Sequence, residues 1–303
     1  LRDGSNYVIE RVELRAVGEP VAVEAITLID LDVPGAEVRG AVDGSPVVAG
    51  NLFFACEHPM AANRVEDGRV VCSSRCHRPV GREVACERSA VIGVAAPGQM
   101  RRSFLYYVER ERARPYRLFL HYNSWWDIAW PDRKMQQDDC LRVIEIFGRE
   151  LVRKRDVPID AFVFDDGWDD PKSLWRFHAG FPDGFAPLKA AAERYDSSVG
   201  TWLSPWGGYG RAKAERLAFG KTQGFETNRR GFSLAGPNYY RRFRDVCVDM
   251  IRKYDVNYFK FDGIAQGVNA PGAGRETGAD VEALLRLTAE LRDVRPDLYL
   301  SIT

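Results

Sequence analysis

The sequence predicts two domains of different class. We expect a β-sandwich over residues 1–112 and an α/β domain, the first half of a TIM-type (β/α)8 barrel, over residues 113–303. Short β-rich runs separated by turn pairs such as Asp43-Gly44 fill the first part, whereas strand-like and helix-like segments alternate in the second. The charged stretch Arg110–Pro115 marks the boundary. The chain begins without Met, which indicates a processed chain or a fragment, and we expect the sandwich to be incomplete at its N-terminus.

The first part has the composition of an all-β domain. No helical period is evident in it, and several short strands at this spacing favour a sandwich. The expected strands are Tyr7–Leu14, Val21–Leu28, Val47–Cys56, Arg69–Cys72, Ala90–Ala95 and Phe104–Val108.

The second part repeats a strand followed by a helix, which is typical of a parallel sheet with helical crossovers. The expected strands are Tyr116–Asn123, Asp160–Asp166, Ser198–Ser204, Val256–Asp262 and Asp297–Thr303. The expected helices are Met135–Arg155, Pro187–Tyr195, Lys213–Phe219, Pro237–Tyr254 and Asp280–Arg292. A doubly wound open sheet is the alternative, but no strand is followed by a glycine fingerprint. With five strands in this chain, three more are expected beyond Thr303 if the barrel closes.

The composition bounds the partners. The chain has 303 residues, 45% of them apolar, and 43 basic side chains balance 43 acidic ones. This balance gives no reason to expect nucleic acid or an anionic membrane surface as partner. No apolar run is long enough to cross a bilayer. Oligomeric state and compartment stay open, with a secreted or periplasmic location slightly favoured over a cytoplasmic one.

Six cysteines divide into two groups. Cys140 and Cys247 fall on apolar positions of expected helices, where a thiol acts as a small hydrophobic group. The other four lie in the first part of the chain. They fit a zinc module poorly, and free thiols are favoured over a disulfide. These four are Cys56, Cys72, Cys76 and Cys86.

The most informative strand ends in Lys260-Phe261-Asp262-Gly263. Lys260 and Asp262 are two residues apart, so on a strand they project to the same side. We expect the Lys ammonium to favour the ionised form of Asp262, which suits a nucleophile or a ligand-binding anion. The alternative is a structural ion pair at the rim of the sheet.

Carboxylates and indoles end the other strands of this part as well. The C-terminal ends of parallel barrel strands gather at one face, where such barrels hold their active sites. Carboxylates bind hydroxyl groups and indole faces stack on sugar rings, so the pattern predicts a carbohydrate site. Each feature has a structural alternative, namely a packed Trp or an Asp that caps the next helix. The residues concerned are Trp125, Asp165, Asp166, Trp168 and Trp202.

In their order, these motifs resemble those of clan D retaining α-glycosidases. The motifs are Asn123-Ser124-Trp125, Asp165-Asp166-Gly167-Trp168, Trp202-x-x-Pro205 and Lys260-x-Asp262. The chain looks most similar to glycoside hydrolase family 36, the α-galactosidase and raffinose-synthase family. Residues 50–59 also look like part of that family's N-terminal β-sandwich.

The resemblance implies a role for each matching residue. Asp262 matches the nucleophile, and Lys260 a lysine that binds sugar hydroxyls. Asp165 and Asp166 match the pair that binds the O4 and O6 side of galactose, while Trp202 matches a wall of the sugar pocket. Trp125 belongs to the same expected substrate site. No cofactor and no metal are implied, and the partner would be an oligosaccharide or glycoside.

The sequence also departs from the family pattern. Ser204 stands where many relatives carry Glu, and Gly263 stands where many bacterial α-galactosidases have Met. The register of a further sugar-binding arginine, Arg229 or Arg230, is not determined by the motif. The family's acid/base Asp lies on strand six, so we expect it beyond Thr303.

The sequence therefore predicts a retaining α-glycosidase of α-galactosidase type that forms a covalent glycosyl-aspartate intermediate. A transglycosylase on the same fold is one alternative, because it differs only in the acceptor. A non-catalytic carbohydrate-binding protein on a degenerate glycosidase scaffold is another. A metal-dependent barrel hydrolase is a third, disfavoured because His121 is the only histidine in an expected barrel strand.

Overall fold

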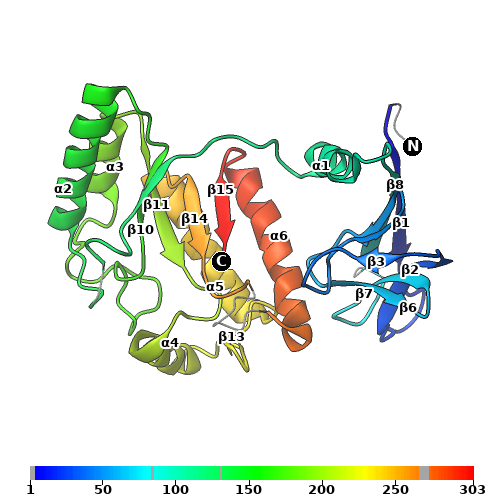
Figure 1. Ribbon diagram of the computed structural model, residues 1–303. Coiled ribbons are helices and arrows are strands. Elements are labelled where there is room, and N and C mark those ends of the chain that lie inside the picture. The colour runs from blue at the N-terminus through cyan, green and yellow to red at the C-terminus, as the bar shows by residue number, and fades with distance from the viewer. Residues whose placement is uncertain (1–3, 83–84, 130–131, 266–272) are drawn as a thin grey trace. The chain divides into compact units, whose positions relative to one another are not determined.

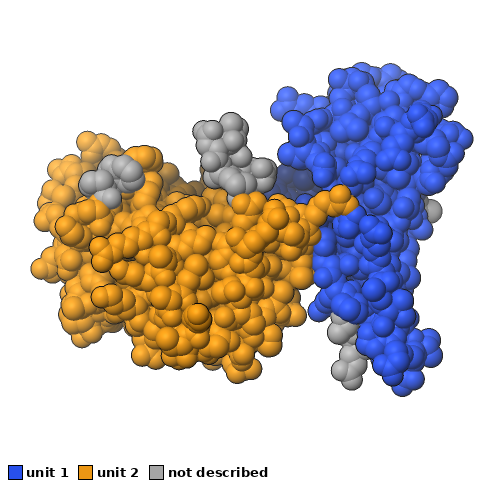
Figure 2. Space-filling model, turned by 90° about the horizontal axis from the view of Figure 1, so that it is seen from below, with its two compact units in different colours: residues 1–117 blue, residues 118–303 orange. Residues whose placement is uncertain are grey.

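The computed structural model describes residues 4–82, 85–129, 132–265 and 273–303. The chain forms two compact units, Leu1–Arg117 and Leu118–Thr303, which are coloured separately in Figure 2. We describe each unit by itself. The expected bounds of the domains, 1–112 and 113–303, remain a prediction.

Unit 1 contains two antiparallel sheets. One has five strands in the order β1-β8-β5-β4-β3, and the other has three in the order β2-β7-β6. The strands are β1 Tyr7–Leu14, β2 Ala25–Asp32, β3 Glu37–Val38, β4 Val47–Ala49, β5 Leu52–Cys56, β6 Ala61–Glu66, β7 Arg69–Arg75 and β8 Cys86–Val94.

Apolar side chains of both sheets share one core. Ile29 on β2, Phe54 on β5 and Val70 on β7 are each no more than 3% exposed and belong to the same cluster. Strand alternation sends every second side chain toward this layer. The predicted β-sandwich is confirmed.

The opposite side of the larger sheet carries a helix, α1 (Met100–Glu111). The expectation of a strand over Phe104–Val108 was wrong. Phe104, Tyr107 and Val108 follow helical spacing and pack with Phe53 of β5 in a second cluster. Five aromatic and aliphatic residues in succession resemble a strand, but their i, i+3 and i+4 positions form the buried face of a helix.

Unit 2 is built on a parallel sheet with the strand order β15-β14-β11-β10-β9. Its strands are β9 His121–Asn123, β10 Ala161–Phe164, β11 Ser198–Leu203, β14 Tyr258–Phe261 and β15 Tyr299–Ile302. The remaining elements are α2 Gln137–Phe147, the π-helix η1 Gly148–Arg153, α3 Ala186–Glu193, α4 Gly210–Thr222, β12 Thr227–Asn228, β13 Gly231–Phe232, α5 Pro237–Tyr254, η2 Arg275–Thr277 and α6 Gly278–Val294. The predicted half-barrel is confirmed, and Figure 1 shows its strands side by side, with α2 next to α3.

The strands of unit 2 divide their side chains between two layers. Phe162 and Phe164 of β10 and Phe261 of β14 join the large cluster that contains helix residues such as Phe243. Residues on the other side of these strands project to the inner face of the sheet. None of the helices within the described ranges is long and apolar enough to span a membrane.

Candidate functional site

The carboxylate of Asp262 lies directly after β14 and is held by three donors. Trp202 donates from Nε1 to Oδ2 at 3.0 Å. Tyr209 and Thr303 each donate a hydroxyl to Oδ1 at 3.0 Å. The Asp262 backbone N–H also donates to the carbonyl of Leu203, which continues the pairing of β14 with β11. Both oxygens of this strand-end carboxylate therefore have defined positions.

Lys260 forms its ion pair with Asp165. The distance from Lys260 Nζ to Asp165 Oδ2 is 2.8 Å, and Asn123 donates its amide to the same oxygen at 3.0 Å. Within the described residues Lys260 has no ion pair with Asp262, so these two side chains do not form the structural ion pair that the sequence left as an alternative. The four-carbon stem of Lys260 reaches across β11 to the end of β10, where Asp165 is only 2% exposed.

Asp166 points into a buried ionic cluster. Its Oδ1 accepts from Arg216 Nη2 at 2.8 Å, and its Oδ2 lies 3.1 Å from Arg133 Nε. Arg216 also binds both oxygens of Asp169, at 3.0 Å and 2.5 Å. Burial raises the pKa of Asp166 above its ordinary value, although Arg216 and Arg133 oppose this shift. Asp166 is not a helix cap, because the next helix, α3, begins only at Ala186.

Arg216 is the residue that sequence reasoning missed most clearly. Its side chain is 1% exposed and it lies on α4, a helix without an apolar stripe. Burial alone would lower the pKa of Arg216, but Asp169 and Asp166 raise it above its ordinary value. The available signal was the group of acidic residues after β10, since buried carboxylates require a cation. Here that cation comes from a later helix.

Trp202 connects this ionic cluster to Asp262. Its ring lies 5.4 Å from the Arg216 guanidinium, and its carbonyl accepts from Trp168 Nε1 at 3.0 Å. At 1% exposure the indole is a buried side chain whose N–H reaches the Asp262 carboxylate. Trp125 is half-buried, and the Arg133 guanidinium lies 5.8 Å from its ring centre. Arg133 thus connects Trp125 to Asp166.

Tyr209 was also not predicted, although it contacts Asp262 directly. Burial raises its pKa, and the Asp262 charge raises it further, so the phenol keeps its proton. Tyr209 follows Gly207 and Gly208, both at positive φ. A Cβ on Gly208 would lie 2.5 Å from Arg216 Nη1, so the chain needs glycine to turn here.

The two departures from the family pattern lie close to this site. Ser204 is 1% exposed, and its hydroxyl has no hydrogen-bond partner among the described residues. Gly263 has φ +90°, and its carbonyl accepts from Trp206 Nε1 at 2.5 Å. A Cβ on Gly263 would approach Trp206 Cδ1 to 3.0 Å. Glycine therefore lets the chain bend away from β14 while Trp206 packs against the turn.

Arg229 and Arg230 lie apart from these carboxylates. Arg229 Nε is 2.9 Å from Glu276, and Arg230 Nη2 is 3.9 Å from the same side chain. Within the described parts of the chain neither forms an ion pair with Asp165, Asp166 or Asp262. They line a hollow beside α4 instead.

The cysteines form one disulfide. Cys76 bonds to Cys86, whereas Cys56 and Cys72 are buried free thiols in the sandwich core. The preference for free thiols is thus correct for Cys56 and Cys72 only. Cys140 and Cys247, predicted as apolar helix residues, are fully buried. Among the described residues no group of three or more His, Cys, Asp or Glu side chains is arranged to hold a metal ion.

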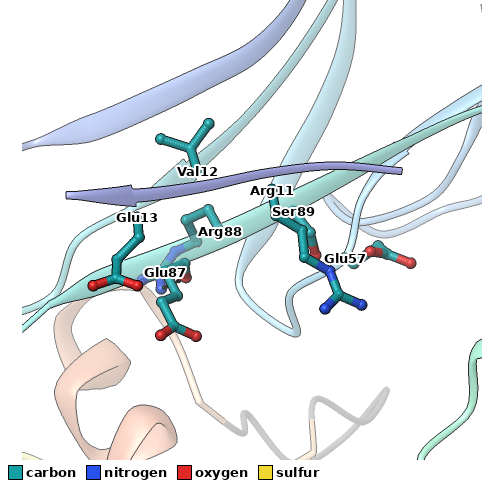
Figure 3. Close-up of a pocket in the computed structure, with 7 residues that line it drawn as sticks. All are labelled: Arg11, Val12, Glu13, Glu57, Glu87, Arg88 and Ser89. Atoms are coloured by element: carbon teal, nitrogen blue, oxygen red, sulfur yellow. Dashed lines mark hydrogen bonds between the residues drawn. The ribbon is translucent and has the colours of Figure 1, made fainter. Parts of the chain in front are cut away.

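Unit 1 carries a hollow of about 470 Å³ on strands β1 and β8. Arg11 and Glu13 project to one side of β1 and Val12 to the other (Figure 3). Glu13 lies opposite Glu87 in the strand pairing, and Arg11 opposite Ser89. The lining thus mixes charges of both signs and defines no single ligand chemistry.

No protein-family model and no curated protein matches this sequence. Solved structures do match its fold. An α-galactosidase from Lactobacillus brevis is similar over 97% of this chain and 42% of its own, with 14% identity and a TM-score of 0.60. A family 36 α-galactosidase variant from Geobacillus stearothermophilus, in complex with 1-deoxygalactonojirimycin, is similar over 98% and 52%, with 13% identity and a TM-score of 0.63. The Thermus thermophilus α-galactosidase in complex with stachyose is similar over 89% and 55%, with 15% identity and a TM-score of 0.55.

These likenesses confirm the family 36 resemblance at the level of the fold. The chain spans about half the length of the solved α-galactosidases that it matches. Its β-sandwich and parallel half-barrel correspond to part of their structure.

Proposed function

We propose that this chain is part of a retaining α-glycosidase of α-galactosidase type, with Asp262 as the nucleophile. One observation carries the proposal. Asp262 ends a central strand of the parallel sheet, and its two oxygens accept hydrogen bonds from three side chains. Donors to both oxygens hold the carboxylate in one orientation.

The proposed chemistry has two displacements. An Asp262 oxygen attacks the anomeric carbon of an α-glycoside while an acid gives its proton to the departing oxygen. The resulting β-glycosyl ester is then attacked by water, which loses a proton to the same acid/base group and releases Asp262. A retaining pair of carboxyl groups is about 5–5.5 Å apart, so we expect the second group to lie at that distance from Asp262.

Asp165 and Lys260 are the proposed sugar contacts. The Asp165–Lys260 pair supplies an acceptor and a charged donor beside the proposed nucleophile, which suits adjacent sugar hydroxyls. Trp202 is assigned mainly to holding Asp262, because its ring is buried. Asp166 supports the site through Arg216 and Arg133, and Trp125 is proposed to line the substrate side through its half-exposed ring.

The test uses the natural full-length protein and an aryl α-galactoside. Asp262→Ala should abolish turnover, and added azide should restore it. Azide would attack the anomeric carbon from the side vacated by the carboxylate, the aryl oxide would leave, and the product would be the β-galactosyl azide. As matched control, Asp249→Ala removes an exposed carboxylate on α5 and should leave turnover unchanged. Turnover by Asp262→Ala close to the parent rate would falsify the assignment.

The same experiment separates the alternatives. Galactosyl transfer to an added sugar, with little free galactose, would identify a transglycosylase. Saturable sugar binding without turnover in the parent protein would instead indicate a non-catalytic carbohydrate-binding role.

A further inference from the structure

A basic hollow of about 540 Å³ lies on unit 2 between α4 and the β12–β13 hairpin. Three of its lining residues, Lys213, Leu217 and Lys221, are spaced by four and so share one side of α4. The chain from Phe225 to Gly231 supplies most of the remaining lining. We propose that this hollow binds an oxyanion group of the phosphate or sulfate type. The inference does not rest on the proposed glycosidase function.

The charge around the hollow is strongly one-sided. Lys213, Lys221, Arg229 and Arg230 all line it, and no Asp or Glu of the described part of the chain does. Outside the lining, the carboxylate of Glu276 lies 2.9 Å from Arg229 and 3.9 Å from Arg230. The four cations of the lining create a positive potential that attracts an anion.

Two of the cations, Lys213 and Arg230, lie close together, and Arg230 has an N–H group without an acceptor among the described residues. Arg230 Nε is buried and has no hydrogen-bond acceptor among the described residues. Lys213 Nζ donates to the Arg230 carbonyl at 2.5 Å. Burial lowers the pKa of Lys213, and the Arg230 guanidinium lowers it further. A bound anion would relieve this repulsion and supply the acceptor that Arg230 lacks.

The hairpin that carries the arginines is held in place without a ligand. Asn228 accepts from the Arg230 backbone N–H at 2.7 Å and donates to Asp280 at 2.9 Å. Ser233 donates to the other oxygen of Asp280 at 2.7 Å. Gly231 has φ +137°, and a Cβ there would lie 2.0 Å from a backbone oxygen, so the hairpin fits closely against its neighbour. Binding would therefore need little ordering of the backbone.

The donors fit a tetrahedral oxyanion. A guanidinium presents a planar fork of N–H groups that matches phosphate oxygens, whereas a lysine adds a point charge. Leu217 and Phe225 give the same hollow an apolar wall. The volume of the hollow lies within the range of small-molecule pockets. It is larger than a single oxyanion needs. Both a free oxyanion and a phosphate or sulfate ester of a sugar have the required chemistry.

Isothermal titration calorimetry of the full chain tests the proposal at low ionic strength. The probes are inorganic phosphate, glucose 6-phosphate and glucose, with sodium chloride at matched ionic strength as blank. Phosphate and glucose 6-phosphate should bind saturably, whereas glucose should not. Arg230→Gln should weaken phosphate binding by about tenfold, because it removes charged donors. Glu276→Gln should strengthen it by about twofold to fivefold, because it removes a competing carboxylate.

The matched control is Arg252→Gln, which removes one exposed cation on α5 and should leave binding unchanged. Tighter binding of glucose 6-phosphate than of phosphate would assign the hollow to an ester, and equal binding to a free oxyanion. If Arg230→Gln does not fold, Glu276→Gln and Lys221→Gln still decide the matter, since Lys221 is exposed. Heats of phosphate titration equal to those of chloride would overturn the proposal, and so would phosphate affinity that is unchanged in Glu276→Gln. The hollow would then be a basic surface that attracts salt ions without a specific site.

Discussion

Replacing Arg216 by Met removes the cation of the buried ionic cluster while roughly keeping the volume of the side chain. Arg216 donates to Asp166 at 2.8 Å, to both oxygens of Asp169, and to the carbonyl of Gly207 at 3.1 Å. It also lies 4.6 Å from the centre of a Trp175 ring. The variant leaves two carboxylates that are each no more than 2% exposed, and Asp169 loses the one ion-pair partner that it has within the described residues.

Breaking a buried ion pair by removing one partner costs about 3–5 kcal/mol. Asp166 keeps Arg133 at 3.1 Å, so most of the loss falls on Asp169. We take a loss of about 4 kcal/mol of unfolding free energy. Divided by a slope of about 2 kcal/mol per molar urea, this loss lowers the urea midpoint of unfolding by roughly 2 M. Urea unfolding followed by tryptophan fluorescence measures this change, because Trp168, Trp175 and Trp202 surround the cluster.

The loss should depend on pH. Burial already raises the pKa of Asp166 with Arg216 present, and loss of Arg216, which opposes this shift, should raise it further. A carboxyl group with a raised folded pKa binds more protons when folded, so its contribution to stability declines as pH rises through that pKa. The difference in unfolding free energy between Arg216→Met and the parent should therefore be largest at pH 7. It should become smaller toward about pH 4, near the pKa of Asp in the unfolded chain.

Arg211→Met is the matched control on the same helix. Arg211 is 90% exposed and, among the residues that the structure describes, pairs with Glu215 alone, so its loss should cost less than about 0.5 kcal/mol at any pH in this window. Equal stability of the two variants at pH 7, or a gap for Arg216→Met that does not change with pH, would refute the reasoning.

Two further predictions concern single bonds. Tyr209→Phe removes one donor to Asp262 and should lower kcat of the proposed α-galactosidase reaction, measured on the full-length protein, by about twofold to tenfold. An unchanged kcat would show that this hydrogen bond does not matter for turnover. Replacing Cys76 and Cys86 by Ser opens a loop with a sequence separation of 10 and should cost unit 1 roughly 3 kcal/mol of unfolding free energy. Calorimetry of both forms checks this, and equal melting temperatures for unit 1 would contradict it.

The parallel sheet of unit 2 could be predicted because its signals are local. Each strand is a short apolar run, and α5 repeats buried residues such as Phe243, Cys247 and Met250 at helical spacing. Once the strands are parallel, their polar ends meet at one edge. Trp202 lies opposite Lys260 in the pairing of β11 with β14, which follows from this register.

The ion pairs could not be predicted, because they depend on which distant cation reaches each carboxylate. The backbones of Lys260 and Asp262 are about 7 Å apart along the strand. The long Lys260 side chain can therefore reach carboxylates on other strands as well. Lys260 takes Asp165, which is 95 positions away in sequence. Arg216 offers no periodic signal, because α4 is polar around most of its circumference. The helix α1 was missed because its apolar residues follow one another without a break. Such a run fits the period of a strand as well as that of a helix.

The indole of Trp202 has a consequence for how the Asp262 carboxylate behaves. The Trp202 carbonyl is fixed by Trp168, its ring lies beside Arg216, and its N–H reaches Asp262. The dipole that faces this carboxylate is therefore oriented when the chain folds, and little reorganisation energy remains when charge on the carboxylate changes. Replacing Arg216 on α4 would thus change the packing of Trp202 and, through it, the hydrogen bond to Asp262 at the end of β14. We therefore expect residues of α4 and β14 to vary together in evolution.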